Sequence, residues 1–260
     1  MGTGTLQATP EAGRCLKHTT AIRATGVVVA LASEVKALTA HNAQPERLTL
    51  LASGAAVWLS GMGPVAAQRA ARGLADAGAK ALAVFGVAGA LDGRLRNGTL
   101  FCPERIVDDS GHDYVVDSGW RIHLLQQLTT TTQSLYAQGS LLSVHAPLLT
   151  STAKISAHHH HAALAVDMES AAVAAVARER GLPFMCVRAI VDEVNDTVPV
   201  ALYDGVDAWG RPRPFGLIAA LCRHPSLLAD LPRLYLRMQR ATHALRAVAE
   251  AAGPTLGWSP

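Results

Sequence analysis

The sequence predicts an α/β fold, a three-layer sandwich in which helices cover both faces of a mixed central β-sheet. Half of the 260 residues are hydrophobic and only 5% are aromatic, which suits helices packed on a buried sheet better than an all-β core. Short apolar runs alternate with longer helical patterns, as is typical of β–α–β units. No repeat or low-complexity linker divides the chain. We therefore expect a single domain over residues 26–252, flanked by a flexible tail at 1–25 and a short tail at 253–260.

The amino-terminal half of this domain alternates strand and helix. GVVVAL (26–31) predicts a strand, and SEVKAL opens the helix that follows it. A second strand ends at Leu59 and leads through a Gly61–Gly63 turn into a helix that has Pro64 in its first turn. A third strand, within AKALAVFGVAGAL, is expected to run into a second glycine turn over Gly86–Gly89.

The carboxyl-terminal half begins with a change of pattern. Around NGTLFCPERIVDD the sequence is β-like without intervening helices, which favours antiparallel pairing. ESAAVAAVARERG predicts a helix ended by Gly181. PFMCVRAIV predicts a buried strand that places Asp192 at its carboxyl end. WGRPRPFG predicts a loop, and a long closing helix is expected over Ala229–Ala252.

Charge and cysteine content exclude several classes of protein. The formal net charge is only +3 and the basic residues are dispersed, so we expect no nucleic-acid partner. The four cysteines lie far apart, without a zinc spacing, which favours a reduced cytoplasmic setting. No apolar run has the length of a membrane span, and residues 1–25 lack the apolar core of a signal peptide.

A run of four histidines, His158–His161, raises the question of a metal site. Consecutive residues spread around a helix, whereas paired ligands on one helix need a spacing of four residues. We therefore predict no metal and place the run in a solvated loop.

Acidic side chains stand at the ends of the predicted strands, where ligands bind in open α/β sheets. Glu34 and Asp192 follow two of the strands, and Glu169 begins a helix, where the helix dipole favours an ionised carboxylate. Each acid also has an ordinary explanation. Asp167 is placed to cap the helix while Glu169 only occupies its first turn, and Asp192 is placed to pair with Arg188.

Several segments together resemble the purine nucleoside phosphorylase and nucleosidase superfamily. The strongest is VDMESAAVA…GLPFMCVRAIVDEVND, with a Met-Glu pair that opens a helix and an R-x-I-x-D strand after it. The resemblance extends to VVVALASEVKAL, LSGMGPVAAQRAARGL and FGVAGALDGRLRNGTLF, so it covers most of residues 26–196.

The resemblance implies a role for each motif residue. Met168 would lie against the ribose, Glu169 would accept hydrogen bonds from its two vicinal hydroxyls, and Asp192 would protonate or hydrogen-bond N7 of the departing purine. Cleavage of a glycosidic bond leaves negative charge on the base, so a proton donor there lowers the barrier. The base-binding residues implied are Ala88, Gly89 and Asp167.

The nucleophile is open to two interpretations. Glu34 matches the position that activates water in the hydrolytic branch, and its charge would repel phosphate. Val87, however, stands where hydrolytic relatives usually have Ser, and the N–H groups of the glycine turns suit an anion. We favour phosphorolysis, with inorganic phosphate as co-substrate and no other cofactor. The predicted phosphate pocket comprises Gly61, Gly63, Gly86 and Arg188, with Arg94 and Arg105 as weaker candidate cations.

The segment from residue 198 to the closing helix is longer than the tail of an ordinary methylthioadenosine nucleosidase. Its HPSLL motif and long helix resemble the hopanoid-associated phosphorylase branch. That branch is taken to remove adenine from adenosylhopane, a triterpenoid joined to the ribose 5′ carbon. The resemblance therefore implies an adenine nucleoside with a bulky apolar 5′ group and a role in hopanoid biosynthesis.

The closing helix has two contrasting faces. We expect the apolar face to pack on the sheet and the basic face to be solvated, with peripheral contact at the inner membrane surface as the alternative. The apolar stripe is Leu231, Leu234, Met238, Leu245 and Val248, and the basic residues opposite are Arg233, Arg237, Arg240 and His243.

Two other functions are consistent with the same motifs. The first is hydrolysis of methylthioadenosine or S-adenosylhomocysteine, and the second is a catalytically silent nucleoside-binding protein on the same fold. Because relatives commonly form dimers, trimers or hexamers, the resemblance also implies a homo-oligomer.

Overall fold

The computed structural model describes residues 22, 24–200, 205–213 and 227–259. Its strands are β1 (Thr25–Val29), β2 (Leu48–Leu50), β3 (Ala56–Leu59), β4 (Ala81–Ala90), β5 (Leu100–Phe101), β6 (Arg105–Asp108), β7 (Asp113–Val115), β8 (Leu135–Tyr136), β9 (Ser140–Ser143), β10 (Ala165–Asp167) and β11 (Phe184–Asp192). Its helices are α1 (Ala32–Leu38), α2 (Pro64–Asp76), α3 (Ser118–Leu128), α4 (Ser151–His161), α5 (Ser170–Arg180) and α8 (Leu227–Ala252).

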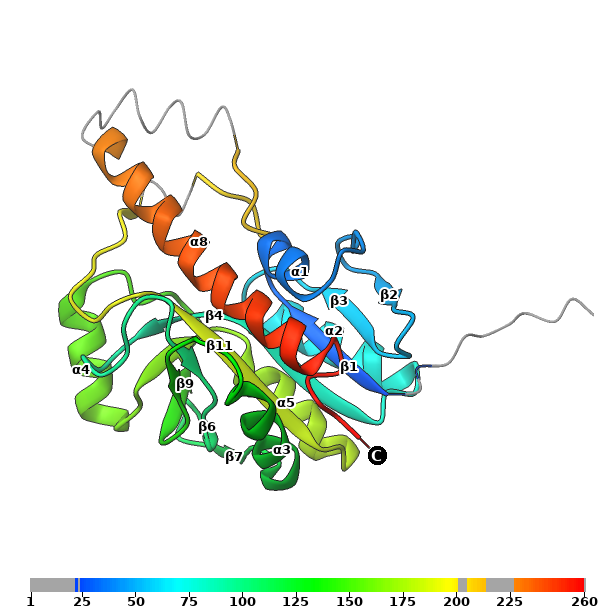
Figure 1. Ribbon diagram of the computed structural model, residues 1–260. Coiled ribbons are helices and arrows are strands. Elements are labelled where there is room, and N and C mark those ends of the chain that lie inside the picture. Colours follow the sequence, from blue (N-terminus) through cyan, green and yellow to red (C-terminus); the bar gives the residue numbers. More distant parts are fainter. Residues whose placement is uncertain (1–21, 23, 201–204, 214–226, 260) are drawn as a thin grey trace, which may run out of the picture.

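The strands form one mixed sheet with helices on both faces (Figure 1), which confirms the predicted three-layer α/β sandwich. The main path of the sheet is β2-β3-β1-β4-β10-β9-β6-β7, and β11, β5 and β8 branch from β4. Helices α2 and α5 pack on each other and on one face. On the other face α8 lies across β4 and β11 and contacts α1 and α3 (Figure 1).

The sheet divides at β4, and this division creates the opening in which the candidate site lies. One edge of β4 pairs in parallel with β11 from Leu82 to Gly89. The other edge pairs with β1 only as far as Val84, and with the antiparallel β10 only at Gly89 and Ala90. Between those pairings, this edge of β4 has no strand partner within the described part of the chain. Side chains can therefore approach the β4 backbone there.

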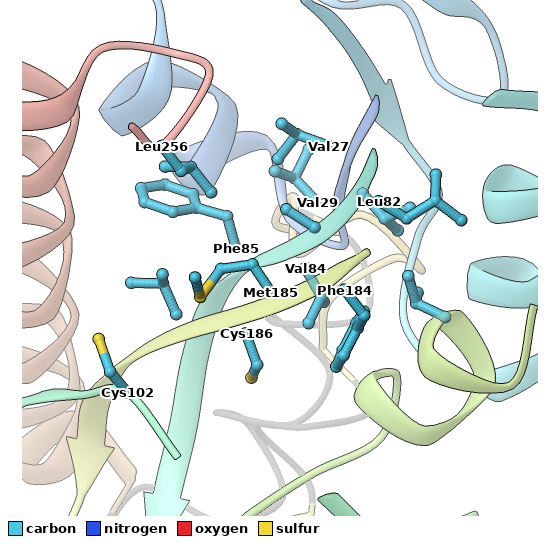
Figure 2. Close-up of a cluster of buried hydrophobic side chains, with 14 of the residues drawn as sticks. Val27, Val29, Leu82, Val84, Phe85, Cys102, Phe184, Met185, Cys186 and Leu256 are labelled. Atoms are coloured by element: carbon cyan, nitrogen blue, oxygen red, sulfur yellow. The ribbon is translucent and has the colours of Figure 1, made fainter. Parts of the chain in front are cut away.

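The core is built on β4 and the two strands parallel to it, β1 and β11. Figure 2 shows side chains of these strands packed together, and Phe85, Met185 and Cys186 among them are fully buried. The thiols of Cys102 and Cys186 are both free, and burial raises the pKa of each to about 12. Both cysteines therefore act as small apolar core residues.

Most local predictions are confirmed where the structure describes the chain. The turn before α2 has positive φ angles of 88° at Gly61 and 97° at Gly63, which glycine adopts without steric cost. Gly181 ends α5 in the left-handed conformation. Residues 209–213 form the predicted loop, and the remainder of WGRPRPFG lies outside the described residues.

The predicted second glycine turn is wrong, because β4 continues as a strand to Ala90. A Cβ atom at Gly86 would collide with the Glu34 carboxylate and the Arg188 guanidinium. A Cβ atom at Gly89 would lie 3.1 Å from an Asp192 carboxylate oxygen. These two glycines therefore leave room for charged side chains above the strand and do not reverse the chain.

Two further expectations need correction. The run His158–His161 forms the last turn of α4 and not a loop. Residues 253–259 are not a free tail, because Leu256 is buried and its carbonyl accepts a 2.7 Å hydrogen bond from Trp120 Nε1. Most of the predicted tail at 1–25 lies outside the described residues. None of the described helices combines the length and the apolar composition needed to cross a membrane.

Candidate active site

A cavity of about 300 Å³ lies where the carboxyl ends of β1, β4, β10 and β11 meet. Four acids border it: Glu34, Asp167, Glu169 and Asp192. The structure thus brings together the acids that the sequence placed at separate strand and helix ends. The rest of the lining is almost entirely apolar and comprises Ala30, Leu31, Met62, Val87, Ala88, Gly89, Val144, Pro147, Leu148, Leu149, Val166, Met168, Val191, Val198, Leu234 and Met238.

Glu34 fills the opening beside β4. One carboxylate oxygen accepts hydrogen bonds from the N–H groups of Ala30 (2.9 Å) and Leu31 (2.8 Å), and the other accepts one from Val87 (2.8 Å). Burial raises the pKa of Glu34, although Arg188 and the three N–H donors oppose the rise. Glu34 therefore holds its proton more tightly than an ordinary glutamate does.

Glu169 connects the start of α5 to the glycine turn before α2. Its Oε1 accepts a 2.8 Å hydrogen bond from Gly63 N, and its Oε2 lies 3.5 Å from the Arg188 guanidinium. Burial and the nearby Asp167 raise the pKa of Glu169 to about 7, against the opposing effect of Arg188. The loss of hydration therefore opposes the ionised form that the helix dipole favours.

Arg188 and Asp167 form an ion pair with side chains that are each only 1% exposed. Asp167 also accepts a hydrogen bond from Ser170 N at 3.2 Å, so it holds the first turn of α5 as well. The Arg188 guanidinium contacts Asp167 and Glu169 through Nη2 and does not border the cavity. The sequence predicted that Arg188 would bind phosphate. Its guanidinium is instead engaged by acids of the protein.

Asp192 pairs with Lys154 and not with Arg188. Burial raises the pKa of Asp192, and the Lys154 ammonium acts in the opposite direction. Lys154 has no signal in the sequence that marks it as part of a site. A single lysine in STAKIS is typical of a solvent-exposed helix position, and only the packing of α4 beside the chain after β11 reveals it.

The Gly61–Gly63 turn is less available to an anion than its sequence suggests. Met62 N donates to Ala208 O at 2.8 Å, and Gly63 N is used by Glu169. Arg94 pairs with Asp92, and Arg105 lies 3.7 Å from Asp113, both away from the cavity. Within the described part of the chain, no Lys, Arg or His lines the cavity.

The histidine run has no metal-binding partners among the described residues. The residues that the structure describes include no group of three or more His, Cys, Asp or Glu side chains that could hold an ion. His158 Nδ1 lies 2.8 Å from Ala163 O, and its Nε2 lies 3.5 Å from Asp92. These are contacts expected of a helix end.

The arrangement suits acid–base chemistry on a ligand that is partly polar and mainly apolar. Acids whose pKa values are raised by burial can serve as proton donors to a ligand, and the apolar lining excludes water from most of a bound molecule.

The raised pKa of Glu169 predicts a pH-dependent component of stability. Between its usual pKa of 4.5 and its folded pKa of about 7, the folded protein keeps a proton that the unfolded chain releases, so unfolding becomes easier as the pH rises. The loss is about 3 kcal/mol across this window. Glu169→Gln cannot titrate but keeps an oxygen for Gly63 N–H. Urea unfolding at pH 5 and pH 8 should therefore show a smaller loss of stability in the variant than in the parent.

The matched control is Glu179→Gln, because the Glu179 side chain is 54% exposed and lies outside the cavity. Between pH 5 and pH 8 this control should lose as much stability as the parent does. Equal losses in Glu169→Gln and the parent would contradict the raised pKa.

Comparisons with known proteins agree with this architecture. The futalosine hydrolase of Helicobacter pylori strain 26695 superposes with a TM-score of 0.62 at 16% identity, over 88% of this chain and 98% of that one. The 5′-methylthioadenosine/S-adenosylhomocysteine nucleosidase of Neisseria meningitidis, in complex with methylthio-immucillin-A, superposes with a TM-score of 0.64 at 17% identity over the same shares. At these identities the likeness shows a shared fold.

A comparison with curated protein sequences gives no match. The family model described as the phosphorylase superfamily matches residues 24–223, which is well over half of the sequence and includes every acid of the cavity. The resemblance seen in the motifs is therefore confirmed at the level of the family, and the chain belongs to the phosphorylase superfamily.

Proposed function

We propose that the protein cleaves the N-glycosidic bond of an adenine nucleoside that carries a large apolar group on its 5′ carbon. The observation that carries this proposal is the composition of the cavity, in which four acids face the same space as an apolar wall. Acids of this kind bind a ribose and protonate a base, whereas the apolar wall suits a substituent without charge.

The positions of the acids support specific roles. Glu169, anchored by Gly63 N–H, would accept hydrogen bonds from the ribose 2′ and 3′ hydroxyls, and Met168 would lie against the sugar. Asp192 would donate a proton to N7 as the bond to the base breaks, with Ala88 and Gly89 beside the base. Asp167 is engaged by Arg188 and Ser170, so we assign it to holding Arg188 and not to the base.

Water is the nucleophile that the geometry supports better. A phosphate dianion in this cavity would face several carboxylates without a described cation beside it, and like charges repel strongly where water is excluded. Glu34, with its pKa raised by burial, is suited to accept a proton from water. This preference replaces the phosphorolysis that Val87 and the two glycine segments favoured in the sequence, with Arg188 as the expected phosphate cation.

The apolar wall supports a large 5′ group. Pro147, Leu148, Leu149, Val198, Leu234 and Met238 all line the cavity and are all half-buried. Partly exposed apolar side chains gathered at one cavity commonly mark a binding surface for a nonpolar ligand. With the resemblance of the carboxyl-terminal segment, this makes adenosylhopane our specific candidate and hopanoid biosynthesis the proposed role.

A second candidate is hydrolysis of methylthioadenosine. The specific observation in its favour is size, because about 300 Å³ is at the small end of ligand cavities and would enclose a methylthio nucleoside completely. A triterpenoid would instead have to extend beyond the cavity along the half-buried wall.

Asp192→Asn should lower kcat for adenine release by about 10² to 10⁴, because the amide cannot deliver a proton to the base. The substrate is 5′-octylthioadenosine, and free adenine is measured by chromatography. Asp76→Asn is the control, because Asp76 is 60% exposed and distant from the cavity. Near-parental turnover in a folded Asp192→Asn protein would remove Asp192 from the mechanism.

The sugar product identifies the nucleophile. Without phosphate, the parent protein should release adenine and a free 5′-substituted ribose at an unchanged rate, because Glu34 activates water. Mass spectrometry of the product distinguishes this sugar from its 1-phosphate. A 1-phosphate that forms only when phosphate is added would establish phosphorolysis instead.

Longer 5′ groups should improve kcat/KM. A series from methylthio- to octylthioadenosine should show gains of up to about fourfold per methylene while the chain remains on the apolar wall. Leu234→Ser should reduce the gain for long chains and leave methylthioadenosine nearly unaffected. Leu236→Ser is the control on the same helix, because Leu236 is 52% exposed and does not line this cavity. A preference for methylthioadenosine in the parent would favour the second candidate.

A further inference from the structure

Lys154 is a fully buried lysine that lies directly behind Asp192. Its side chain has 0% exposure. A lysine is rarely buried unless its charge is paired and its N–H groups are bonded. Here Nζ donates to the Asp192 carboxylate, to Glu193 O at 2.9 Å and to Asp196 O at 3.0 Å. All three donors of the ammonium are thus directed to the end of β11 and the short segment that follows it.

The contact fixes one oxygen of Asp192 and leaves the other unused. Lys154 bonds to Oδ2 of Asp192, and among the described residues no hydrogen bond reaches Oδ1. Lys154 itself does not line the cavity, whereas Asp192 does. The ammonium therefore holds the carboxyl group from the side that a ligand does not occupy.

The other charged groups around Asp192 offset one another. Asp196, on the segment after β11, raises the pKa of Asp192, and Arg237 of α8 lowers it. These two groups form their own ion pair at 2.5 Å. Glu193 pairs with Arg96 at 2.7 Å. Lys154 lowers the pKa of Asp192 more than any other group does, against the effect of burial.

We propose that Lys154 is a positioning residue that orients the carboxyl group of Asp192 toward the leaving base and stabilises the carboxylate formed when the proton is given up. This inference rests on the proposed function. As the bond from C1′ to N9 breaks, its electron pair goes to the base, N7 takes the proton of Asp192, and Asp192 becomes a carboxylate. That carboxylate then faces the Lys154 ammonium, so the negative charge is paired as it develops.

In this role Lys154 changes the acid strength of Asp192 and not the binding of the ligand. Without the ammonium, the effect of burial on Asp192 would lose its main opposition and the pKa would rise further, so the acid would hold its proton too tightly to transfer it well. The form of Asp192 that carries a proton would then persist to higher pH.

The test compares the pH profiles of the parent, Lys154→Met, Lys154→Arg and the control Lys80→Met, in which the replaced lysine is exposed. Adenine release from 5′-octylthioadenosine gives kcat and KM between pH 5 and pH 10. In Lys154→Met we expect kcat to fall about 10- to 100-fold with little change in KM. This loss is smaller than the full contribution of a general acid, because Asp192 itself is still present. The alkaline limb of kcat/KM should move to higher pH. Lys154→Arg retains the charge and should return the limb toward its parental position.

Several outcomes overturn the inference. An unshifted alkaline limb in folded Lys154→Met, with kcat within twofold of the parent, would show that Lys154 does not act through Asp192, while the proposed function would stand. A fall in kcat without a shift of the limb would indicate a structural role only. If Lys154→Met unfolds at the assay temperature, Lys154→Gln replaces it, because glutamine keeps N–H donors without the charge. This variant should also move the alkaline limb to higher pH. An unmoved limb counts against the inference. Absence of adenine release by the parent would instead overturn the proposed function itself.

Discussion

The buried guanidinium of Arg188 is the interaction on which the candidate site depends. It lies on β11 and pairs with Asp167 at the end of β10, with Glu169 beside it. Removing one partner from a buried charge cluster typically destabilises a protein by about 3 to 5 kcal/mol, because the remaining charges are left without compensation. Arg188 therefore allows several acids to be buried at one end of the sheet. It also links β11, β10 and the start of α5 through charge.

The division of the sheet at β4 gives those acids a space to occupy. β4 leaves β1 after Val84 and joins β10 only at Gly89, and the carboxylate of Glu34 takes the place of the missing strand partner by accepting from Val87 N. The helix α8 crosses β4 and β11 on one face (Figure 1). Its residues Leu234 and Met238 line the same cavity. The strands thus position the acids, while the closing helix contributes to the apolar wall.

Both described cations of the site act from behind its acids. Arg188 and Lys154 are each almost completely buried, and neither borders the cavity. Cations in this position change the proton affinity of carboxylates without presenting charge to a ligand. This arrangement favours proton transfer over anion binding, and for that reason we propose water and not phosphate as the nucleophile.

Local patterns in the sequence determined the fold class, the strands β1, β3, β4 and β11, the helices α1, α2, α5 and α8, the Gly61–Gly63 turn and the acids of the site. Apolar periodicity, helix-ending glycines and the Met168-Glu169 pair are properties of neighbouring residues, so they can be recognised without coordinates. The tertiary structure decided the partner of Asp192, the engagement of Arg188 and the reason for the glycines in β4. Each of these depends on the distance between segments far apart in the chain, and Lys154 and Asp192 are 38 residues apart. Burial, which sets the pKa values of the acids, likewise arises only when helices close over the sheet.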